Sequence, residues 1–306
     1  MYKLTCSITL IILLTSVQCT GQKKEHITKA NNNNTLLWQV TGKGIKPTYL
    51  YGTMHLLCAE DAVLSNNVKN IIQQVDKVYF ELDMDDMAAM MGVITKMNMR
   101  DGVQLKDLLT ATEYDKVKNY FANKKSMLPF SMMEKYKPIM LASTIMQEDM
   151  PCKKGISGIE MKMMEYNSTF KNKKEILGLE PVTLQVAIFD SIPYKEQATM
   201  LVQYIDSAAI TSKQTQKLVV AYLSQNLKTL EELVTKSEPG LEKYTDILLT
   251  NRNKDWVNQL QVIGKTKSFI AAVGAAHLVG NAGVLQLLKN AGYTVIPLNN
   301  TTTKLK

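Results

Sequence analysis

Two of the three histidines in this chain stand in the same sequence setting. The stretches YGTMHLL, residues 51–57, and VGAAHLVG, residues 273–280, both contain a glycine, two further residues, a histidine and a leucine. An imidazole can bind a metal ion or transfer a proton near neutral pH. Each motif alone is a weak signal, but its repetition makes His55 and His277 candidates for a single site.

A carboxylate follows a third apolar run. The stretch VYFELD, residues 78–83, ends with Glu81 and Asp83, which face the same way in an extended strand. Such carboxylates are costly to desolvate unless they meet water, a cation or a metal. Two histidines and one carboxylate suffice to hold a divalent ion that activates water. We therefore interpret His55, His277 and Glu81 as ligands of a divalent metal ion (manganese, cobalt or zinc). The alternative is that both histidines are satisfied core residues and Glu81 lies at a helix N-terminus.

These residues need strands that end at a common edge. The stretch PTYLYG precedes His55 and SFIAAVG precedes His277, and both are typical of buried strands. Ligand sites of open α/β sheets lie beyond the carboxyl ends of the strands. If the two strands are neighbours, Gly52 and Gly274 let the backbone turn sharply and aim both imidazoles into one crevice.

The order of strand-like and helix-like segments in the remaining chain predicts an α/β (α+β) fold. TLLWQVTG and PTYLYG read as a hairpin joined by KGIKP, KEILGL reads as a short strand, and NAGVLQLLKNAG followed by YTVIPL closes a β-α-β unit. Apolar residues recur every three or four positions from 84 to about 137 and again between 182 and 249, which indicates helices. We predict one domain over residues 35–300, with a central mixed sheet built from N- and C-terminal strands and a helical insert at about 84–150.

Composition excludes one class of partner. The chain has 306 residues, of which 45% are hydrophobic and 21% charged, as in ordinary globular proteins. Its 36 lysines and arginines exceed its 28 acids, but the lysines are scattered and form no basic stripe with interleaved aromatics. We therefore expect no nucleic-acid partner. Nothing in the composition indicates an oligomeric state.

The N-terminus reads as an export signal. One lysine precedes the apolar run LTCSITLIILLTSV, which is too short to span a membrane, and QCTGQKKEH is polar. We predict a signal peptide over residues 1–19, cleaved after Cys19, followed by a flexible polar arm over 20–34. In the alternative interpretation Cys19 becomes a lipid-modified first residue. The protein is then periplasmic, secreted or held at the cell envelope.

Export changes how the cysteines are interpreted. Cys58 and Cys152 remain after cleavage, and a disulfide can persist in an oxidising compartment. We predict that they form a structural disulfide, which would connect GTMHLLC to MPCKKGISGIE. The alternative is two separate buried thiols.

The quoted motifs together resemble the TraB/GumN family, which includes the Tiki proteases. The similarity runs in order through LLWQVTGKGIKPTYLYGTMHLL, VYFELD, GLE, LLTNRNKDWVNQL and FIAAVGAAHLVGNAGVLQLLKNAGYTVIPL. The resemblance implies a metal-dependent hydrolase, specifically a peptidase acting on a peptide or protein substrate. It assigns the metal-binding and catalytic constellation to His55, His277 and Glu81.

The resemblance adds further candidates. Asn251 and Arg252 match the family's RN segment, where a cation could neutralise an oxyanion or a substrate carboxylate, although Arg252 could equally pair with surface acids. Glu160, in SGIE, is a candidate general base. Glu160 and Glu180 could each instead be a further metal ligand or a hydrogen-bond partner that orients a ligand histidine, and Glu180 could equally cap the helix after Pro181.

Two other functions remain open at this stage. One is a metal-free hydrolase of the erythromycin-esterase kind, in which a histidine is the base and an acid orients it. The other is a non-catalytic binder that captures a peptide in the crevice without cutting it, as TraB-type relatives are associated with restraining a peptide pheromone.

Overall fold

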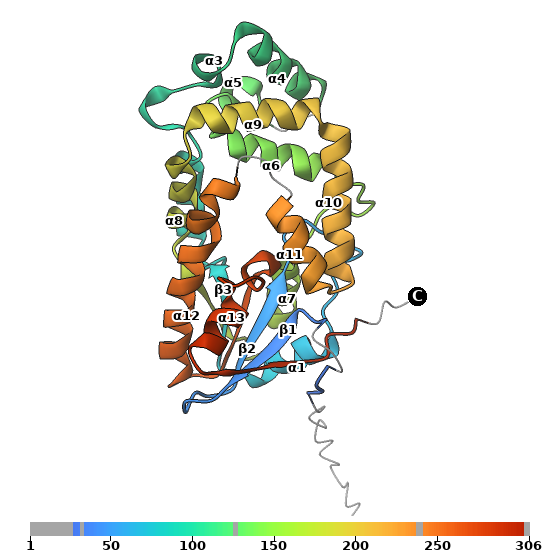
Figure 1. Ribbon diagram of the computed structural model, residues 1–306, viewed down its shortest axis with the longest axis vertical. Helices are drawn as coiled ribbons and strands as arrows, with labels where there is room; N and C mark the ends of the chain where they lie inside the picture. The colour runs from blue at the N-terminus through green and yellow to red at the C-terminus, as the bar shows by residue number, and fades with distance from the viewer. Residues whose placement is uncertain (1–26, 31–33, 125–127, 237–240, 303–306) are drawn as a thin grey trace, which may run out of the picture.

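Six strands of the described chain form one mixed sheet (Figure 1). The computed structural model describes residues 27–30, 34–124, 128–236 and 241–302. The strand order is β4-β3-β5-β2-β1-β6. The strands are β1 Leu37–Thr41, β2 Thr48–Thr53, β3 Lys77–Leu82, β4 Glu175–Glu180, β5 Phe269–Gly274 and β6 Thr294–Pro297. N- and C-terminal strands thus share one sheet, which confirms the predicted fold class.

The centre of the sheet is parallel because its strands are joined through helices. β2, β5, β3 and β4 run parallel as neighbours, whereas β1 is antiparallel to β2 and to β6. The turn between β1 and β2 begins at Gly42, and Gly42 and Gly44 both have positive φ, a conformation that favours glycine. This agrees with the predicted hairpin.

Two layers of helices bury the faces of the sheet. Successive residues of β5 alternate between two core clusters: Ile270 and Ala272 belong to one, and Ala271 and Val273 belong to the other. The first cluster is completed by α1 Asn66–Gln74 and α7 Ile159–Ser168, and the second by α12 Asn251–Gly264 and α13 Val284–Asn290. The two-sided burial explains why β5 carries an unbroken apolar run.

The other helices form a cap with its own core. The cap helices are α2 Met87–Lys96, α3 Leu105–Leu108, α4 Ala111–Asn123, α5 Phe130–Met133, α6 Pro138–Glu148, α8 Val182–Ile188, α9 Tyr194–Asp206, α10 Ala208–Leu223 and α11 Leu227–Lys236. Short helical turns are η1 Arg100–Gly102, η2 Phe189–Ser191, η3 Glu242–Tyr244, η4 Asp246–Thr250 and η5 Ala275–His277. A third apolar cluster joins α4, α6 and α9, with Phe121, Leu141 and Leu201 buried in it. In Figure 1, α3 to α6 and α9 lie at the end of the molecule opposite the sheet, with α8 and α10 descending on either side.

Part of the predicted leader can be followed. Residues 1–19, where we predict the signal peptide, lie outside the described residues. Within the predicted arm, Lys29 forms an isolated β-bridge with Leu298, and the Asn67 amide donates to the Thr28 carbonyl at 3.1 Å. No helix in the described part of the chain is long and apolar enough to cross a membrane.

The predicted disulfide is present. Cys58 and Cys152 are bonded with their Cα atoms 5.0 Å apart and 94 residues apart in sequence. Cys58 also forms a β-bridge with Ile156, so the segments after β2 and before α7 are joined twice. Because the cross-link closes a long loop, we expect it to restrict the unfolded chain strongly.

The double substitution Cys58→Ser and Cys152→Ser should lower the free energy of unfolding by about 4 kcal/mol, through release of that loop. Urea unfolding followed by circular dichroism measures this. As a control, reductant should lower the midpoint of the wild type but leave that of the variant unchanged. A variant as stable as the oxidised wild type would contradict the expectation.

Candidate active site

The two histidine turns lie side by side at one edge of the sheet. β2 and β5 pair in parallel with Thr53 opposite Gly274, so both chains leave the sheet at the same level. The glycines are required by close packing. A Cβ atom at Gly52 would lie 2.8 Å from a Leu278 methyl, and one at Gly274 would lie 3.1 Å from a Glu81 oxygen. The prediction that these strands are neighbours is confirmed.

His277 is buried and held at both nitrogens. The amide nitrogen of Asn253 donates to the Ala282 carbonyl at 2.8 Å, which leaves Asn253 Oδ1 facing His277 Nδ1 at 2.6 Å. Nδ1 therefore carries the proton, and Nε2 accepts from Arg252 Nη1 at 3.1 Å. The Trp256 ring lies 4.4 Å away between centroids. Burial lowers the pKa of His277 to about 4, so the ring is neutral at physiological pH.

His55 stands in the opposite environment. Its side chain is 64% exposed, and Nδ1 lies 3.2 Å from Oε1 of Glu160. The hydrogen bond to this carboxylate raises the pKa of His55 to about 9. The same sequence motif thus gives one buried neutral imidazole and one exposed imidazolium.

Glu160 belongs to the first turn of α7. Backbone bonds from Ser157 N to Leu57 O and from Ile159 N to Met54 O hold this turn against the segment that carries His55. Glycine at position 158 leaves the required room, since a Cβ there would lie 2.9 Å from Glu160 Oε2. The side chain is only 3% exposed. Apart from the ion pair with His55, neither carboxylate oxygen has a hydrogen-bond partner among the described residues.

Glu81 is fixed from three sides. Oε1 accepts from Gly274 N at 2.7 Å, and Oε2 accepts from Arg252 Nη2 at 2.7 Å and from Gln185 Nε2 at 3.0 Å. Oε1 lies 3.9 Å from His277 Nε2. Burial acts to raise the pKa of Glu81, but the interaction with His277, the cations Arg252 and His55 and the bond from Gly274 N hold it below its ordinary value. The carboxylate is therefore an anion at neutral pH.

Arg252 connects Glu81 to Glu180 at the end of β4. Its Nε lies 3.1 Å from both Glu180 oxygens, and its guanidinium carbon is 4.8 Å from the centre of the Trp256 ring. Trp256 Nε1 also donates to Glu180 at 3.2 Å. Arg252 therefore pairs with buried acids instead of surface ones. Glu180 makes no cap for α8, whose N-cap Pro181 has no side-chain hydrogen bond.

Two further candidates lie apart from this cluster. Asn251 is exposed at the start of α12, and Asp83 accepts a local bond from Asp85 N at 3.1 Å. Sequence reasoning missed Asn253, Trp256 and Gln185. The helical spacing of 252, 253 and 256 could have indicated the first two, because these positions share one face of a helix.

Comparison with known proteins places this site in a family. The model of the TraB/PrgY/gumN family matches residues 36–297, a span that includes both histidine turns and all the acids described above. The chain belongs to the TraB/PrgY/gumN family.

This family member is similar to named proteases at low identity. It is 21% identical to Metalloprotease TIKI1 of Danio rerio over 88% of its own length and 64% of the relative's. It is 22% identical to the Metalloprotease TIKI homolog of Nematostella vectensis over 90% and 69%, and 23% identical to Metalloprotease TIKI2 of Xenopus tropicalis over 89% and 62%. The chain thus spans about two thirds of the length of these relatives. No solved structure was found to match it.

The donor chemistry of this TraB/PrgY/gumN protein fits a divalent ion. Each histidine has an oxygen at Nδ1, from Glu160 or from Asn253, as metal-binding imidazoles commonly do, although Nε2 of His277 is bonded to Arg252. The unpaired Glu160 oxygens add buried negative charge. As the side chains lie, no three His, Cys, Asp or Glu residues of the described chain converge closely enough to hold a metal.

We expect the two imidazoles to titrate far apart. In NMR spectra of labelled histidines, the His55 midpoint should lie near pH 9 and the His277 midpoint near pH 4. Unfolded His277 binds a proton near pH 6.5, so its contribution to stability should be lost as the pH falls from there to about 4. The His55 contribution is complete below pH 6.5 and is lost as the pH rises through about 9. His55→Gln and His277→Gln assign the resonances, and two midpoints near 6.5 would contradict these environments.

Proposed function

We propose that this protein is an exported peptidase that uses a divalent metal ion. The observation that carries the proposal is that both histidines follow neighbouring strands, each with an oxygen at Nδ1, at the edge of the sheet near which Glu81 lies in β3. The similarity to proteins named as metalloproteases supports peptide bonds as the substrate class. The disulfide and the apolar leader support export to the periplasm, the cell envelope or the medium.

In this proposal Nε2 of His55, Nε2 of His277 and the Glu81 carboxylate would hold the ion, after His55 gives up its proton and Arg252 Nη1 moves away from His277 Nε2. When bound, the ion would polarise the amide carbonyl and lower the pKa of a water molecule toward neutrality. Manganese, cobalt and zinc are the candidates, because imidazole and carboxylate donors suit all three.

The protein supplies the remaining steps. Glu160 Oε1 faces His55, whereas Oε2 has no hydrogen-bond partner among the described residues and would accept the proton from the attacking water. Arg252 and Gln185 orient Glu81, and Asn253 sets the His277 tautomer. Arg252 is already bonded to buried carboxylates, so its role is to position them. The departing amine would take up the proton held on Glu160.

One specific contact favours a second candidate, a hydrolase without a metal. The His55 and Glu160 side chains already form a histidine–carboxylate pair at 3.2 Å, in which His55 would be the base once its proton is lost and Glu160 would orient it. Such an enzyme would retain its activity after exhaustive chelation, whereas a metallopeptidase would lose it. A third possibility is a protein that binds peptides without cutting them. In such a protein, Glu81→Ala would lower the affinity for peptide and change nothing else that can be measured.

Metal content tests the ligand set directly. Elemental analysis of the purified mature protein, loaded in turn with Mn²⁺, Co²⁺ and Zn²⁺, should find about one ion per chain. His55→Ala and His277→Ala should each abolish this binding, and His26→Ala, the same change at the third histidine, should not. If no ion binds under any loading condition, the metal-free alternative is favoured.

Glu160→Gln tests the proposed base. It keeps the size of the side chain but cannot accept a proton, so kcat on a peptide library read by mass spectrometry should fall at least about 100-fold. Glu165→Gln is the matched control, since Glu165 lies on the same helix with its side chain 68% exposed. Equal activity of the two variants would remove Glu160 from the mechanism.

A further inference from the structure

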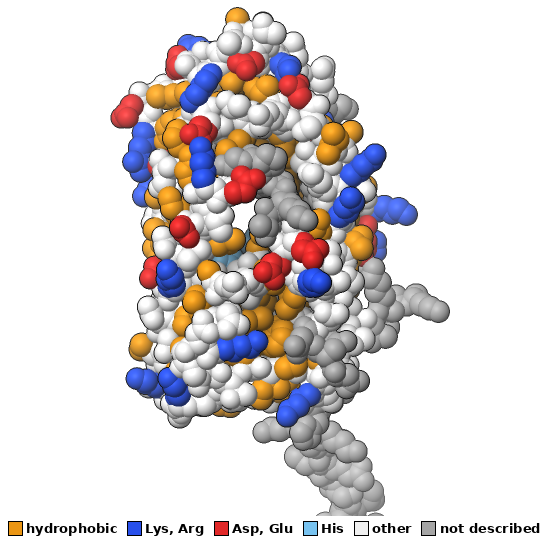
Figure 2. Space-filling model, viewed as in Figure 1, with side chains coloured by type: hydrophobic (Ala, Val, Ile, Leu, Met, Phe, Trp, Pro, Cys, Tyr) orange, Lys and Arg blue, Asp and Glu red, His pale blue; other side chains and the backbone are white. Residues whose placement is uncertain are grey.

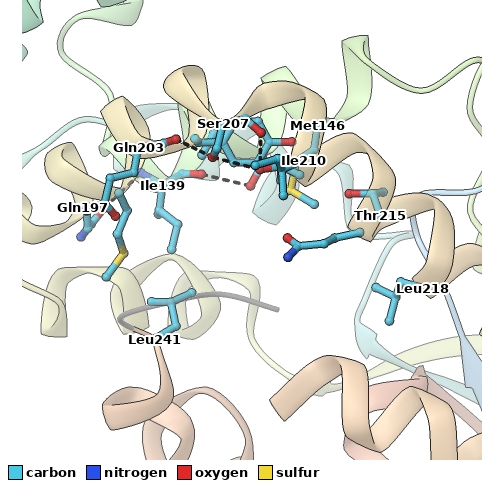
Figure 3. A pocket seen from close by; sticks show the side chains of 15 residues that line it. Ile139, Met146, Gln197, Gln203, Ser207, Ile210, Thr215, Leu218 and Leu241 are labelled. Carbon is cyan, nitrogen blue, oxygen red and sulfur yellow. Dashed lines mark hydrogen bonds between the residues drawn. The ribbon is translucent and has the colours of Figure 1, made fainter. Parts of the chain in front are cut away.

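The cap contains a partly open cavity that the chemistry above does not use; Ile210, one of its lining residues, is 62% exposed. The cavity has a volume of about 290 Å³ and lies between α6, α9 and α10, with Leu241 on its opposite side (Figure 3). Ile139, Met146, Ile210 and Leu218 contribute apolar side chains, and none of the described residues that line it is charged. At about 30 Å³ for each water molecule, the space corresponds to roughly ten waters, or to one or two large apolar side chains.

One face of α10 connects this cavity to the candidate active site. Thr211, Thr215 and Leu218 line the cavity at helical spacing, and Tyr222 follows on the same face. The Tyr222 hydroxyl donates to the Gly52 carbonyl at 3.0 Å, near the end of β2, three residues before His55. Tyr222 also lies close enough to Glu160 for that carboxylate to raise the pKa of the phenol, after the larger effect of burial.

The surface agrees with this connection. Figure 2 shows a hollow in the face between the two sides of the cap, and a histidine side chain is visible within it. A ligand that extends from the cavity along α10 would approach Tyr222 and Gly52, which lies near the end of β2, three residues before His55.

The polar groups of the cavity suit a peptide. The side-chain amides of Gln203 and Gln214 make no hydrogen bond to other described residues, although both line the space. An amide offers both a donor and an acceptor, as each peptide unit of an extended chain does. A hydrocarbon chain would fill the same volume but would leave these amides unpaired, which is unfavourable when they are covered.

We infer that the cavity between α6, α9 and α10 binds an uncharged, apolar stretch of a peptide substrate, next to the bond that is cut at the edge of the sheet. The inference rests on the proposed peptidase function for its link to cleavage. Binding itself needs no turnover, so the two can fail separately.

Fluorescence anisotropy of a labelled peptide tests this inference. The probe has four consecutive large apolar residues between uncharged polar ends, and a second probe has serine at those four positions. We use the Glu160→Gln protein, so that no probe is hydrolysed. Thr211→Phe in this background places a ring in the cavity, and Val220→Phe is the matched control on the same helix, at a position that is 65% exposed and does not line the cavity.

The apolar probe should bind and the serine probe should bind at least about tenfold more weakly. Thr211→Phe should weaken binding of the apolar probe by a similar factor, and Val220→Phe should leave it unchanged, with equal melting temperatures for both variants. Equal affinity for Thr211→Phe and Val220→Phe would overturn the inference. The inference would also be overturned if dodecanoate displaced a fluorescent dye bound in the cavity and neither peptide did. If the apolar probe binds as expected but wild type cleaves no peptide, only the peptidase proposal fails.

Discussion

The parallel pairing of β2 with β5 is the constraint on which the site depends. It sets Thr53 opposite Gly274, and therefore brings two turns more than 200 residues apart in sequence to one level of one edge. A shift of this register by one residue would turn every side chain of β5 to the opposite face and exchange its two core clusters. The apolar core on both sides of β5 therefore also fixes the position of the imidazoles. The same register thus serves both stability and the site, and Gly274 at the end of β5 leaves room for the Glu81 carboxylate.

Buried charge is the cost of this arrangement, and Arg252 offsets it. Glu81 and Glu180 both end strands inside the protein, where an unpaired carboxylate is strongly unfavourable. The guanidinium bonds to both and stacks on Trp256, and its Nη1 stands at the unprotonated nitrogen of His277. One cation thus holds two acids and one base in fixed positions. Glu160 has no such cation except His55, which is exposed, and so it is the buried acid whose charge a ligand or ion could change most.

The site residues at the ends of strands could be predicted from sequence. A buried strand is recognised by its apolar run, and the residues at the end of that run must lie at the edge of the sheet. These residues are His55, His277, Glu81 and Glu180. The disulfide could be predicted because an exported protein enters an oxidising compartment. The different environments of the two histidines could not be predicted. Nothing in GTMH or GAAH distinguishes them; the difference comes from α12, which brings Asn253 and Trp256 to His277 alone. The phase of that helix depends on packing against the sheet. The contact of Glu160 with His55 likewise depends on a loop that the Cys58–Cys152 bond and neighbouring backbone bonds hold in place.

In the proposed function, different parts of the fold carry chemistry and recognition. The groups that could transfer protons or hold an ion are attached to the sheet and to α7 and α12, where dense hydrogen bonding leaves little freedom. The cap has its own apolar core and reaches the sheet edge through contacts such as Tyr222 to Gly52. Substitutions in the cavity wall could therefore alter which peptide is bound without disturbing Glu81, Arg252 or His277. Because α10 spans both regions, a ligand that fills the cavity would press on the same helix that supports the His55 turn. The bond from Tyr222 to the Gly52 carbonyl is a contact through which the cavity wall and the end of β2 meet.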